Sequence, residues 1–242
     1  MYRAFVEIRE KRAWLPEDEQ HHLLTVRRSR PGDQFIGLDG KGKAYLCALA
    51  REGRESFGEI LQELPESRET PLSIILAQAL VKKDKFDWIV QKAVELGVKE
   101  IIPIKTFRTE VRIDDHREEK KKTRWQKIMM AAVKQSGRTR IPELAETMTL
   151  EECLKRRSAS LRFVLDEEGG GTLAELIRSR SAWDSCCFFI GPEGGWDEED
   201  RKIFRRHSVP PVQLGPRTLR AETAPLVVLS ILQYELGDLA IW

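Results

Sequence analysis

The chain has 242 residues, of which 41% are hydrophobic and 33% are charged, a composition that suits a globular protein with an apolar core. Its formal net charge of +2 is too small to indicate a nucleic-acid partner by itself, because affinity for nucleic acids follows local basic patches. Four cysteines without a CxxC pair argue against a zinc or redox site, so we expect no metal and four buried thiols.

Residues 1–70 predict a small β-barrel domain. Met1–Phe5 lacks the apolar core of a signal peptide and no apolar run is long enough to cross a bilayer, so we expect a cytoplasmic protein without a membrane partner. Asp39–Lys43 predicts a hairpin, because its glycines supply the positive φ that such turns need. A short helix is expected over residues 17–28. The expected strands are Arg3–Val6, Gln34–Leu38, Ala44–Leu49 and Glu59–Leu61.

Residues 71–242 predict a second domain, joined through a polar linker over 65–71, in which strands and helices alternate. Leu72–Ala77 is continuously apolar, as expected for a strand of a parallel sheet that is covered on both faces. The next helix is expected to begin at Asp84 as its N-cap and to end at Gly97. Further strands are expected over 101–104 and 161–165, and further helices over 118–136, 173–178 and 225–236.

Two glycine-bearing loops near the C-terminus are the most informative feature of the chain. Residues 188–196 and 214–224 each contain an apolar run, a glycine-bearing loop and a helix start. Such loops line the crevice at the carboxyl ends of parallel strands, where open α/β sheets bind ligands. A Rossmann dinucleotide site is disfavoured, because its glycine loop follows an early strand and only one strand and one helix can follow here. The first loop alone is equally well explained as a tight strand-to-helix turn, and the presence of the second loop favours a ligand site.

Polar side chains in these loops suggest chemistry. Arg220 can stabilise negative charge on a substrate, or it can form a salt bridge to Glu222 or Glu193. Thr223 is equally well explained as the N-cap of the last helix, and Asp197 is expected to cap the helix after the first loop.

A basic block over 120–127, continued by Lys134, Arg138 and Arg140, is strongly one-signed. Such runs are usually solvated helix faces, and the alternative is a surface that neutralises phosphates. Lys82 and Lys85 could add to that surface.

Together these segments resemble the RsmE family of the SPOUT methyltransferase superfamily, whose members methylate N3 of one uridine in bacterial 16S ribosomal RNA. The resemblance covers essentially the whole chain, and its last two segments are highly specific in combination. It is carried by His22–Arg28, Gly32–Asp33, Asp39–Gly40, Lys92–Val98, Arg124–Trp125, Gln135–Arg138, Ile190–Gly195 and Leu214–Ala224.

The resemblance implies a PUA-like β-barrel over residues 1–70 that positions RNA, and a trefoil-knotted α/β methyltransferase domain over residues 71–242. It also implies S-adenosylmethionine (SAM) as cofactor, the small ribosomal subunit as partner, and a homodimer. The last helix, apolar almost all round, would then form the dimer interface. The implied cofactor contacts are Ile190, Gly191, Pro192, Gly194, Leu214, Gly215, Leu219, Arg220, Thr223 and Ala224.

Methylation of uridine N3 requires loss of its proton, and the ring oxygens then carry negative charge. We therefore expect Arg220 to stabilise that charge, and Glu193 or Glu222 to orient the base or accept the proton. A SPOUT enzyme that acts on another RNA position, such as a ribose hydroxyl of transfer RNA, and an RNA-binding module without catalysis are the alternatives. The residues expected to hold RNA are Arg3, Arg28, Lys82, Gln135 and Arg138.

Overall fold

The computed structural model describes residues 1–53, 55–65, 68–109, 115–179 and 182–240. The chain forms two compact units, which are Met1–Glu69 with Met130–Ile141, and Thr70–Met129 with Pro142–Trp242. The segment Met130–Ile141 therefore folds with the N-terminal unit, although it lies far along the sequence from it.

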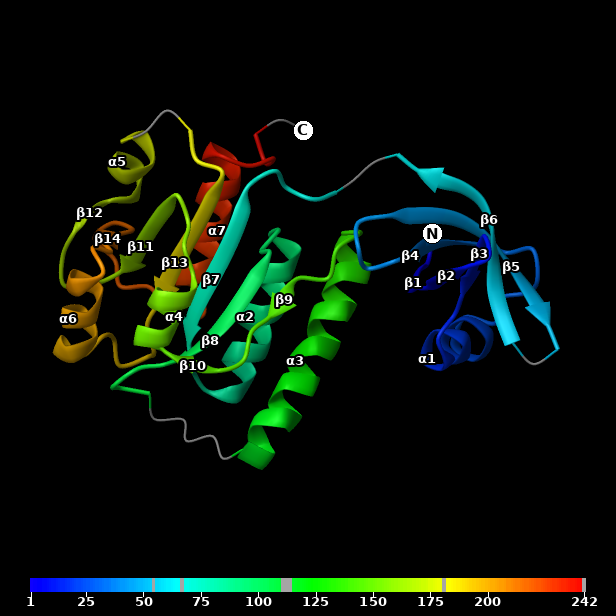
Figure 1. Ribbon diagram of the computed structural model, residues 1–242, viewed down its shortest axis with the longest axis horizontal. Coiled ribbons are helices and arrows are strands. Elements are labelled where there is room, and N and C mark those ends of the chain that lie inside the picture. The colour runs from blue at the N-terminus through cyan, green and yellow to red at the C-terminus, as the bar shows by residue number, and fades with distance from the viewer. Residues whose placement is uncertain (54, 66–67, 110–114, 180–181, 241–242) are drawn as a thin grey trace. The chain divides into compact units, whose positions relative to one another are not determined.

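A six-stranded sheet forms most of the described part of the N-terminal unit, in the order β1-β4-β5-β6-β3-β2 (Figure 1). Its pairs are antiparallel except for β1 with β4. The expected hairpin joins β4 to β5, and Asp39 Oδ1 accepts the amides of Lys41, Gly42 and Lys43 at 2.7–3.0 Å. The strands are β1 (Arg3–Phe5), β2 (Glu7–Arg9), β3 (Arg12–Trp14), β4 (Gln34–Leu38), β5 (Ala44–Glu52) and β6 (Glu55–Leu64).

The expected helix over 17–28 is shorter and irregular. It begins as α1 (Glu17–His21), continues as a π-helical turn, η1 (His22–Val26), and stops before Arg28. Arg28 has a φ of 56°, a left-handed conformation that non-glycine residues seldom adopt. The chain therefore turns sharply at Arg28 and leaves its side chain exposed.

A parallel sheet forms the centre of the C-terminal unit, in the order β10-β8-β7-β13-β11-β14-β12, with β9 also paired to β8. Every pair in this described sheet is parallel, so the carboxyl ends of its strands meet at one edge. The strands are β7 (Ser73–Ala79), β8 (Glu100–Lys105), β9 (Glu143–Leu144), β10 (Met148–Thr149), β11 (Leu161–Leu165), β12 (Gly171–Thr172), β13 (Ser185–Ile190) and β14 (Pro211–Gln213).

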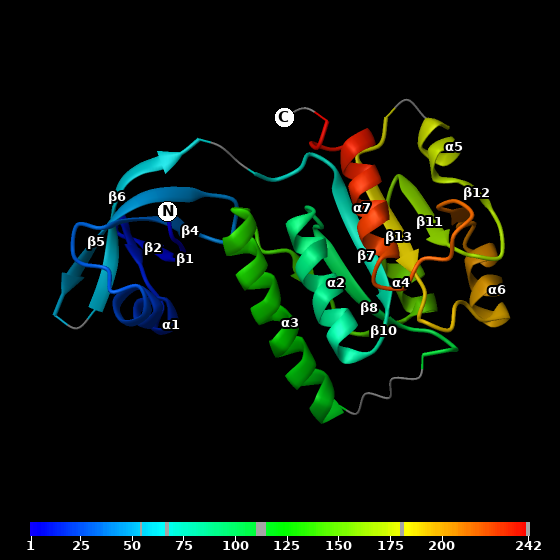
Figure 2. The ribbon, with the colours of Figure 1, turned by 180° about the vertical axis from the view of Figure 1, so that it is seen from behind.

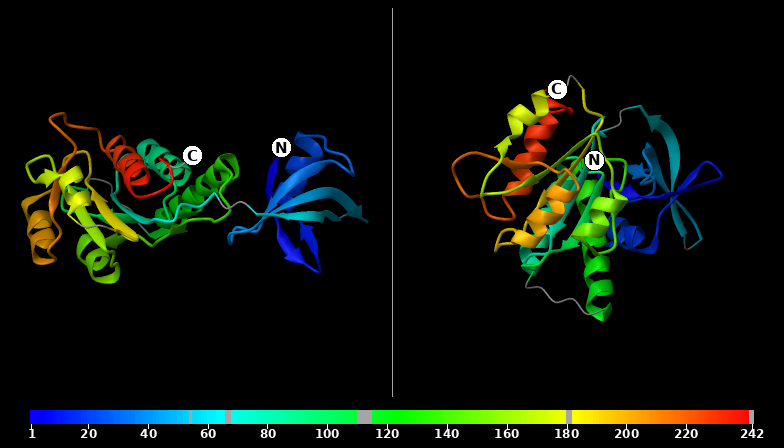
Figure 3. Two further views of the ribbon diagram at one scale, coloured as in Figure 1. Left: turned by 90° about the horizontal axis from the view of Figure 1, so that it is seen from above. Right: turned by 60° about the vertical axis from the view of Figure 1, so that its left-hand side comes forward.

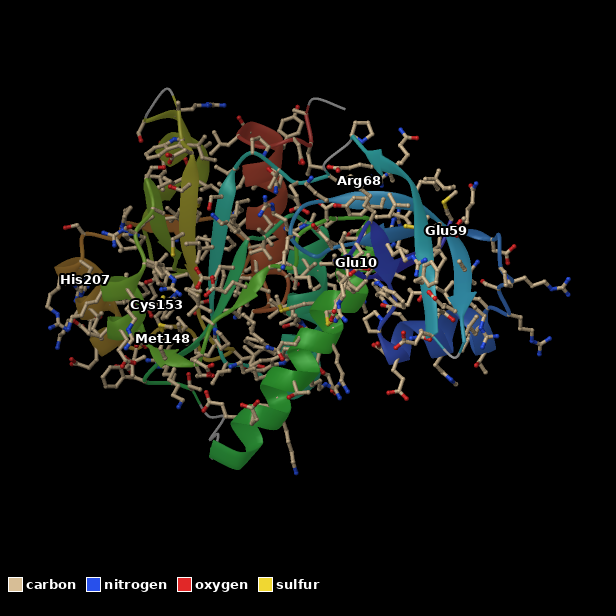
Figure 4. The ribbon with its side chains drawn as sticks, turned by 45° about the vertical axis from the view of Figure 1, so that its right-hand side comes forward. Glu10, Glu59, Arg68, Met148, Cys153 and His207 are labelled. Carbon is tan, nitrogen blue, oxygen red and sulfur yellow. The ribbon has the colours of Figure 1, made fainter. Side chains whose placement is uncertain are left out.

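Helices cover both faces of this sheet, as its apolar central strands require. Figure 2 shows α2 and α7 in front of the sheet, and the left view of Figure 3 shows α4 and α6 on the opposite side. Cys153 on α4 and Met148 just before it, both labelled in Figure 4, belong to a buried cluster that also contains Phe189 and Phe204. The helices are α2 (Lys83–Glu95), α3 (Asp115–Ser136), α4 (Leu150–Arg156), α5 (Leu173–Arg178), α6 (Glu198–Arg206) and α7 (Ala224–Glu235).

Most expected elements are confirmed, but the expected cap of α2 is wrong. Lys82 is the N-cap residue, no side chain caps the helix, and Asp84 lies within its first turn. Asp197 caps α6 as expected, because its carboxylate accepts the amide of Glu199. Gly97 ends α2 with a φ of 86°. The sequence did not predict the short elements β2, β3, β9, β10, β12 and α4.

The four cysteines are free and buried, as expected. Burial raises the pKa of Cys47 to about 11 and that of Cys153 to about 12, which makes both thiols unreactive. In the described parts of the chain, no helix is long and apolar enough to cross a membrane. The same residues contain no group of three or more His, Cys, Asp or Glu side chains arranged to hold a metal ion.

Candidate active site

A cavity of about 600 Å³ opens at the carboxyl ends of β11, β13 and β14. Three segments line it, each following one of these parallel strands, which is where α/β sheets bind ligands. The volume lies within the range of pockets for small molecules. The lining segments are residues 165–167, residues 190–196 except Gly194, and residues 212–224 except Glu222 and Thr223.

The structure brings most of the expected cofactor contacts together at this cavity. Gly194 and Thr223 are the two expected contacts that are not among the described residues lining the cavity. Thr223 occupies the N-cap position of α7, but its hydroxyl makes no capping bond. That this set holds a cofactor stays a prediction. The expected contacts that line the cavity are Ile190, Gly191, Pro192, Leu214, Gly215, Leu219, Arg220 and Ala224.

Close packing fixes the loop that follows β13. Trp196 is buried, and its indole Nε1 donates to the carbonyl of Leu165 at 2.6 Å. A Cβ on Gly191 would lie only 3.1 Å from that indole, so a larger residue there would require the indole to shift. Gly195 has a φ of 70°, a conformation that favours glycine.

Arg108 is a part of this site that sequence reasoning missed. Its Nη1 donates to the carbonyl of Gly194 at 2.9 Å, and its Nε donates to Asp197 at 3.3 Å. Arg108 therefore ties the segment after β8 to the loop after β13. Its place just beyond the carboxyl end of a predicted strand is the signal that could have found it.

Charged groups of both signs line the cavity. Asp166 is buried and accepts two hydrogen bonds from Arg201, at 2.7 and 3.0 Å. Burial raises the pKa of Asp166, but its bonds to Arg201 and to the amide of Glu168 outweigh burial, so the net pKa is lowered. Arg220 is exposed at the cavity and forms no ion pair among the described residues. It is therefore available to an anionic group of a ligand.

The two expected catalytic carboxylates lie together, on either side of a lysine. Lys85 Nζ is 3.4 Å from Glu193 Oε1 and 3.2 Å from Glu222 Oε2. The amide of Lys82 also donates to Glu193 Oε1, at 3.4 Å. Glu193 lines the cavity, whereas Glu222 is not among the described residues that line it. The alternative expected for Arg220 is a salt bridge to Glu193 or Glu222. Among the described residues Arg220 forms neither bridge, and Lys85 pairs with both carboxylates instead.

Of the five residues expected to hold RNA, two are engaged in contacts within the protein and three have exposed side chains. Arg3 donates to the carbonyls of Lys134 and Gln135 at 3.1 and 3.2 Å, so it caps the end of α3. Arg138 is buried, and its guanidinium donates to Glu69 at 2.7 Å. In contrast, the side chains of Arg28, Lys82 and Gln135 are exposed. All five remain predicted RNA contacts.

Ion pairs neutralise much of the basic block on α3. Arg124 pairs with Asp87, to which Trp125 Nε1 also donates at 3.1 Å. Lys134 pairs with Glu19 at 2.6 Å. Lys122 pairs likewise with Glu146. The block is therefore less positive in the fold than in the sequence.

Comparisons with known proteins agree with this site. The model of the RNA methyltransferase domain matches residues 68–233, and that of the RNA methyltransferase PUA domain matches residues 15–60. Ribosomal RNA small subunit methyltransferase E of Bacillus subtilis is 32% identical over 225 residues, 90% of this chain and 88% of the relative. The protein of the same name from Aquifex aeolicus is 33% identical, over 90% of this chain and 92% of its own. The chain belongs to the RsmE family.

Solved structures extend the match to the whole fold. The Neisseria gonorrhoeae member of the family, bound to SAM, superposes with a TM-score of 0.89 at 33% identity, covering 99% of both chains. A Legionella pneumophila protein in complex with SAM superposes with a TM-score of 0.90 at 32% identity, again over 99% of both chains. The expected fold class, a PUA-like domain together with a SPOUT-type α/β methyltransferase domain, is confirmed.

Proposed function

We propose that this protein transfers a methyl group from SAM to N3 of a single uridine, uridine 1498, in the 16S RNA of the small ribosomal subunit. The observation that carries the proposal is the cavity between two glycine loops. At its wall lie the carboxylate of Glu193 and the cation of Arg220, which forms no ion pair with any described residue. Membership of the RsmE family supports the reaction class. An enzyme that acts on ribosomal subunits would work in the cytoplasm.

The cavity fits SAM in size and in chemistry. Its volume of about 600 Å³ is sufficient for a ligand of that size, and Ile190, Leu214 and Leu219 offer apolar surface for the adenine. Glu167 offers an exposed carboxylate to the hydroxyl or ammonium groups. Backbone amides of the glycine loops can donate to the polar groups that remain. When bound, SAM supplies a methyl group activated by a positively charged sulfur.

The residues of the chain would manage the proton and the charge of the uracil. The carboxylate of Glu193 or Glu222 accepts the proton from N3. The negative charge then spreads onto the ring oxygens, and the Arg220 guanidinium stabilises it. The N3 atom lies on the pairing edge of uracil, so the base has to be unstacked and unpaired before it reaches the cavity.

The N-terminal unit would position the RNA. Arg28 presents an exposed cation on a tight left-handed turn, and Gln135 is exposed near the end of α3. In the other unit, Lys82 is exposed beside Glu193. Contacts of this kind with phosphates position a nucleic acid without reading its sequence.

We also propose that α7 forms the interface of a homodimer. The helix is strongly apolar, yet part of its surface is not covered within the described chain. Tyr234 is 62% exposed, and Val227 and Ile231 are half-buried on neighbouring turns. A second copy would cover this face. Sedimentation of wild type and of Ile231→Glu tests it, and a monomeric wild type would contradict it.

The test of the reaction uses purified protein, labelled SAM and small ribosomal subunits that lack the modification. Mass spectrometry of the digested RNA should identify 3-methyluridine. Label in a ribose-methylated nucleoside would instead favour the alternative RNA position. Cofactor binding without transfer to subunits or to free 16S RNA would favour an RNA-binding role or another substrate. Comparison of subunits with free RNA also identifies the form of the substrate.

A further inference from the structure

Lys85 connects three parts of the chain at the edge of the cavity. It lies in the first turn of α2, and its ammonium is 3.4 Å from Glu193, on the loop after β13. The same ammonium is 3.2 Å from Glu222, which lies just before α7. The sequence indicated for Lys85 only a contribution to a phosphate-binding surface. Because both of its partners are carboxylates, the structure gives it a different role.

Glu222 depends on Lys85 for charge compensation. Its side chain is 18% exposed, and Oε2 is buried without an aligned hydrogen bond in the described chain. Burial raises the pKa of Glu222, whereas its backbone amide and Lys85 lower it, with a smaller contribution from Arg220, and the net pKa is lowered. A buried carboxylate that loses its counter-charge is strongly disfavoured in the ionised form.

Glu193 is held at the start of α2 by two donors. The amide of Lys82 and the ammonium of Lys85 both approach Oε1, each at 3.4 Å. The positive end of the helix dipole also favours a carboxylate there. Glu193 and Glu222 thus share one ammonium, and without it their like charges would repel and favour protonation of one of them.

We propose that Lys85 is a positioning residue of the methyl-transfer site, which balances the negative charge of Glu193 and Glu222 and fixes both carboxylates at the edge of the cavity. The inference rests on the proposed function, because the proton of uridine N3 needs an ionised carboxylate as its acceptor. The charged groups around Lys85 are these two carboxylates, with Arg220 acting on Glu222 at longer range.

The test compares Lys85→Met and Lys85→Arg with wild type in single-turnover methylation between about pH 5 and about pH 9. At the acidic end of this pH range, Lys85→Met should methylate about tenfold or more slowly than wild type. The difference between the two rates should narrow as rising pH ionises the carboxylates of the variant again. Lys85→Arg keeps the charge and should stay within about threefold of wild type. Lys92→Met is the matched control, since Lys92 lies on the same helix and pairs only with Glu95 among the described residues.

A double-mutant cycle separates positioning from direct contact with the substrate. If Lys85 acts through the carboxylates, Lys85→Met should cost little more in a Glu193→Gln, Glu222→Gln background. The affinity for SAM, measured by calorimetry, should change less than the rate. An equal loss at every pH, or full additivity in the cycle, would overturn the inference.

A measurement that does not depend on methylation tests the role of Lys85 independently of the reaction. Carboxyl-carbon NMR of glutamate-labelled protein should show one site carboxylate titrating at higher pH in Lys85→Met than in wild type. Glu193→Gln and Glu222→Gln assign the two signals. If wild type formed no 3-methyluridine, the proposed function would fail while this titration still tested Lys85. Unchanged titration in Lys85→Met would overturn the role of Lys85 even in an active enzyme.

Discussion

Arg138 and Arg220 are both functional candidates in the sequence, yet the fold gives them opposite surroundings. Arg138 is 5% exposed and hydrogen-bonded to Glu69, whereas Arg220 is exposed at the cavity and forms no ion pair among the described residues. A guanidinium that already has a carboxylate partner holds the fold together. One without a partner can meet a ligand. The difference teaches that the counter-charge, rather than the residue type, separates a structural arginine from a functional one.

The largest expected effect on stability is at Arg138. Arg138→Ala should lower the free energy of unfolding by about 3 kcal/mol, because it leaves the Glu69 carboxylate without its cation. Urea denaturation measures the loss. Arg30→Ala, at an exposed arginine of the same unit, should change stability by less than about 0.5 kcal/mol. If Arg138→Ala and Arg30→Ala both changed the free energy of unfolding only slightly, Arg138 would not have the structural role inferred for it.

Arg220 should show the reverse pattern. Arg220→Ala should lower the single-turnover rate of methylation by about 100-fold to 1,000-fold, because it removes a donor to the developing charge. Its free energy of unfolding should stay within about 0.5 kcal/mol of wild type. Arg205→Ala, which removes a surface partner of Glu198 on α6, is the control for a lost arginine. A near-normal rate in Arg220→Ala would remove this residue from the mechanism.

The ion pair of Asp166 and Arg201 allows the stabilising effect of a paired charge to be measured as a function of pH. Since the folded pKa of Asp166 is lowered, its ionised form stabilises the fold above its unfolded pKa of about 3.9, and this contribution disappears as pH falls through the folded pKa. Asp166→Asn should therefore lower stability by about 1.5–3 kcal/mol at neutral pH. Denaturation at neutral pH and near pH 3 should show this deficit shrinking in acid. A deficit independent of pH would argue against an ionic contribution.

The cap of α6 should have a moderate effect. Asp197→Ala removes the acceptor for the amide of Glu199 and a partner of Arg108, so we expect a loss of about 1 kcal/mol in stability. Because Arg108 also holds Gly194, the affinity for SAM should fall as well, which isothermal titration would measure. Unchanged affinity would show that the loop does not need this anchor.

The smallest effect is expected at Arg28. Arg28→Glu should weaken binding of RNA and reduce the slope of its salt dependence by about 1, as expected for a lost phosphate contact. Affinity for SAM should be unchanged, because Arg28 belongs to the N-terminal unit and the cavity to the other. Binding titrations at several salt concentrations provide the measurement. An equal fall in cofactor affinity would contradict a division of labour between the units.

Local rules allowed the sequence to predict much of the fold. The hairpin at Asp39, the C-terminal end of α2 and the start of α6 depend on side chains and φ preferences within a few residues. The apolar runs of β7 and β13 indicate strands of a parallel sheet that is covered on both faces. A continuous apolar run is also a local signal in the sequence. The glycine loops were recognisable from their glycines alone, and the close approach of the Trp196 indole to Gly191 explains one of them.

Only the tertiary structure decided which charges pair. Glu69 meets Arg138, Lys85 meets Glu193 and Glu222, and Arg108 meets Gly194, all across long stretches of sequence. The order of the strands and the packing of residues 130–141 with the N-terminal unit were likewise invisible in the sequence. An ion pair requires a counter-charge within a few ångströms, and local sequence patterns do not specify which distant residue the fold places there.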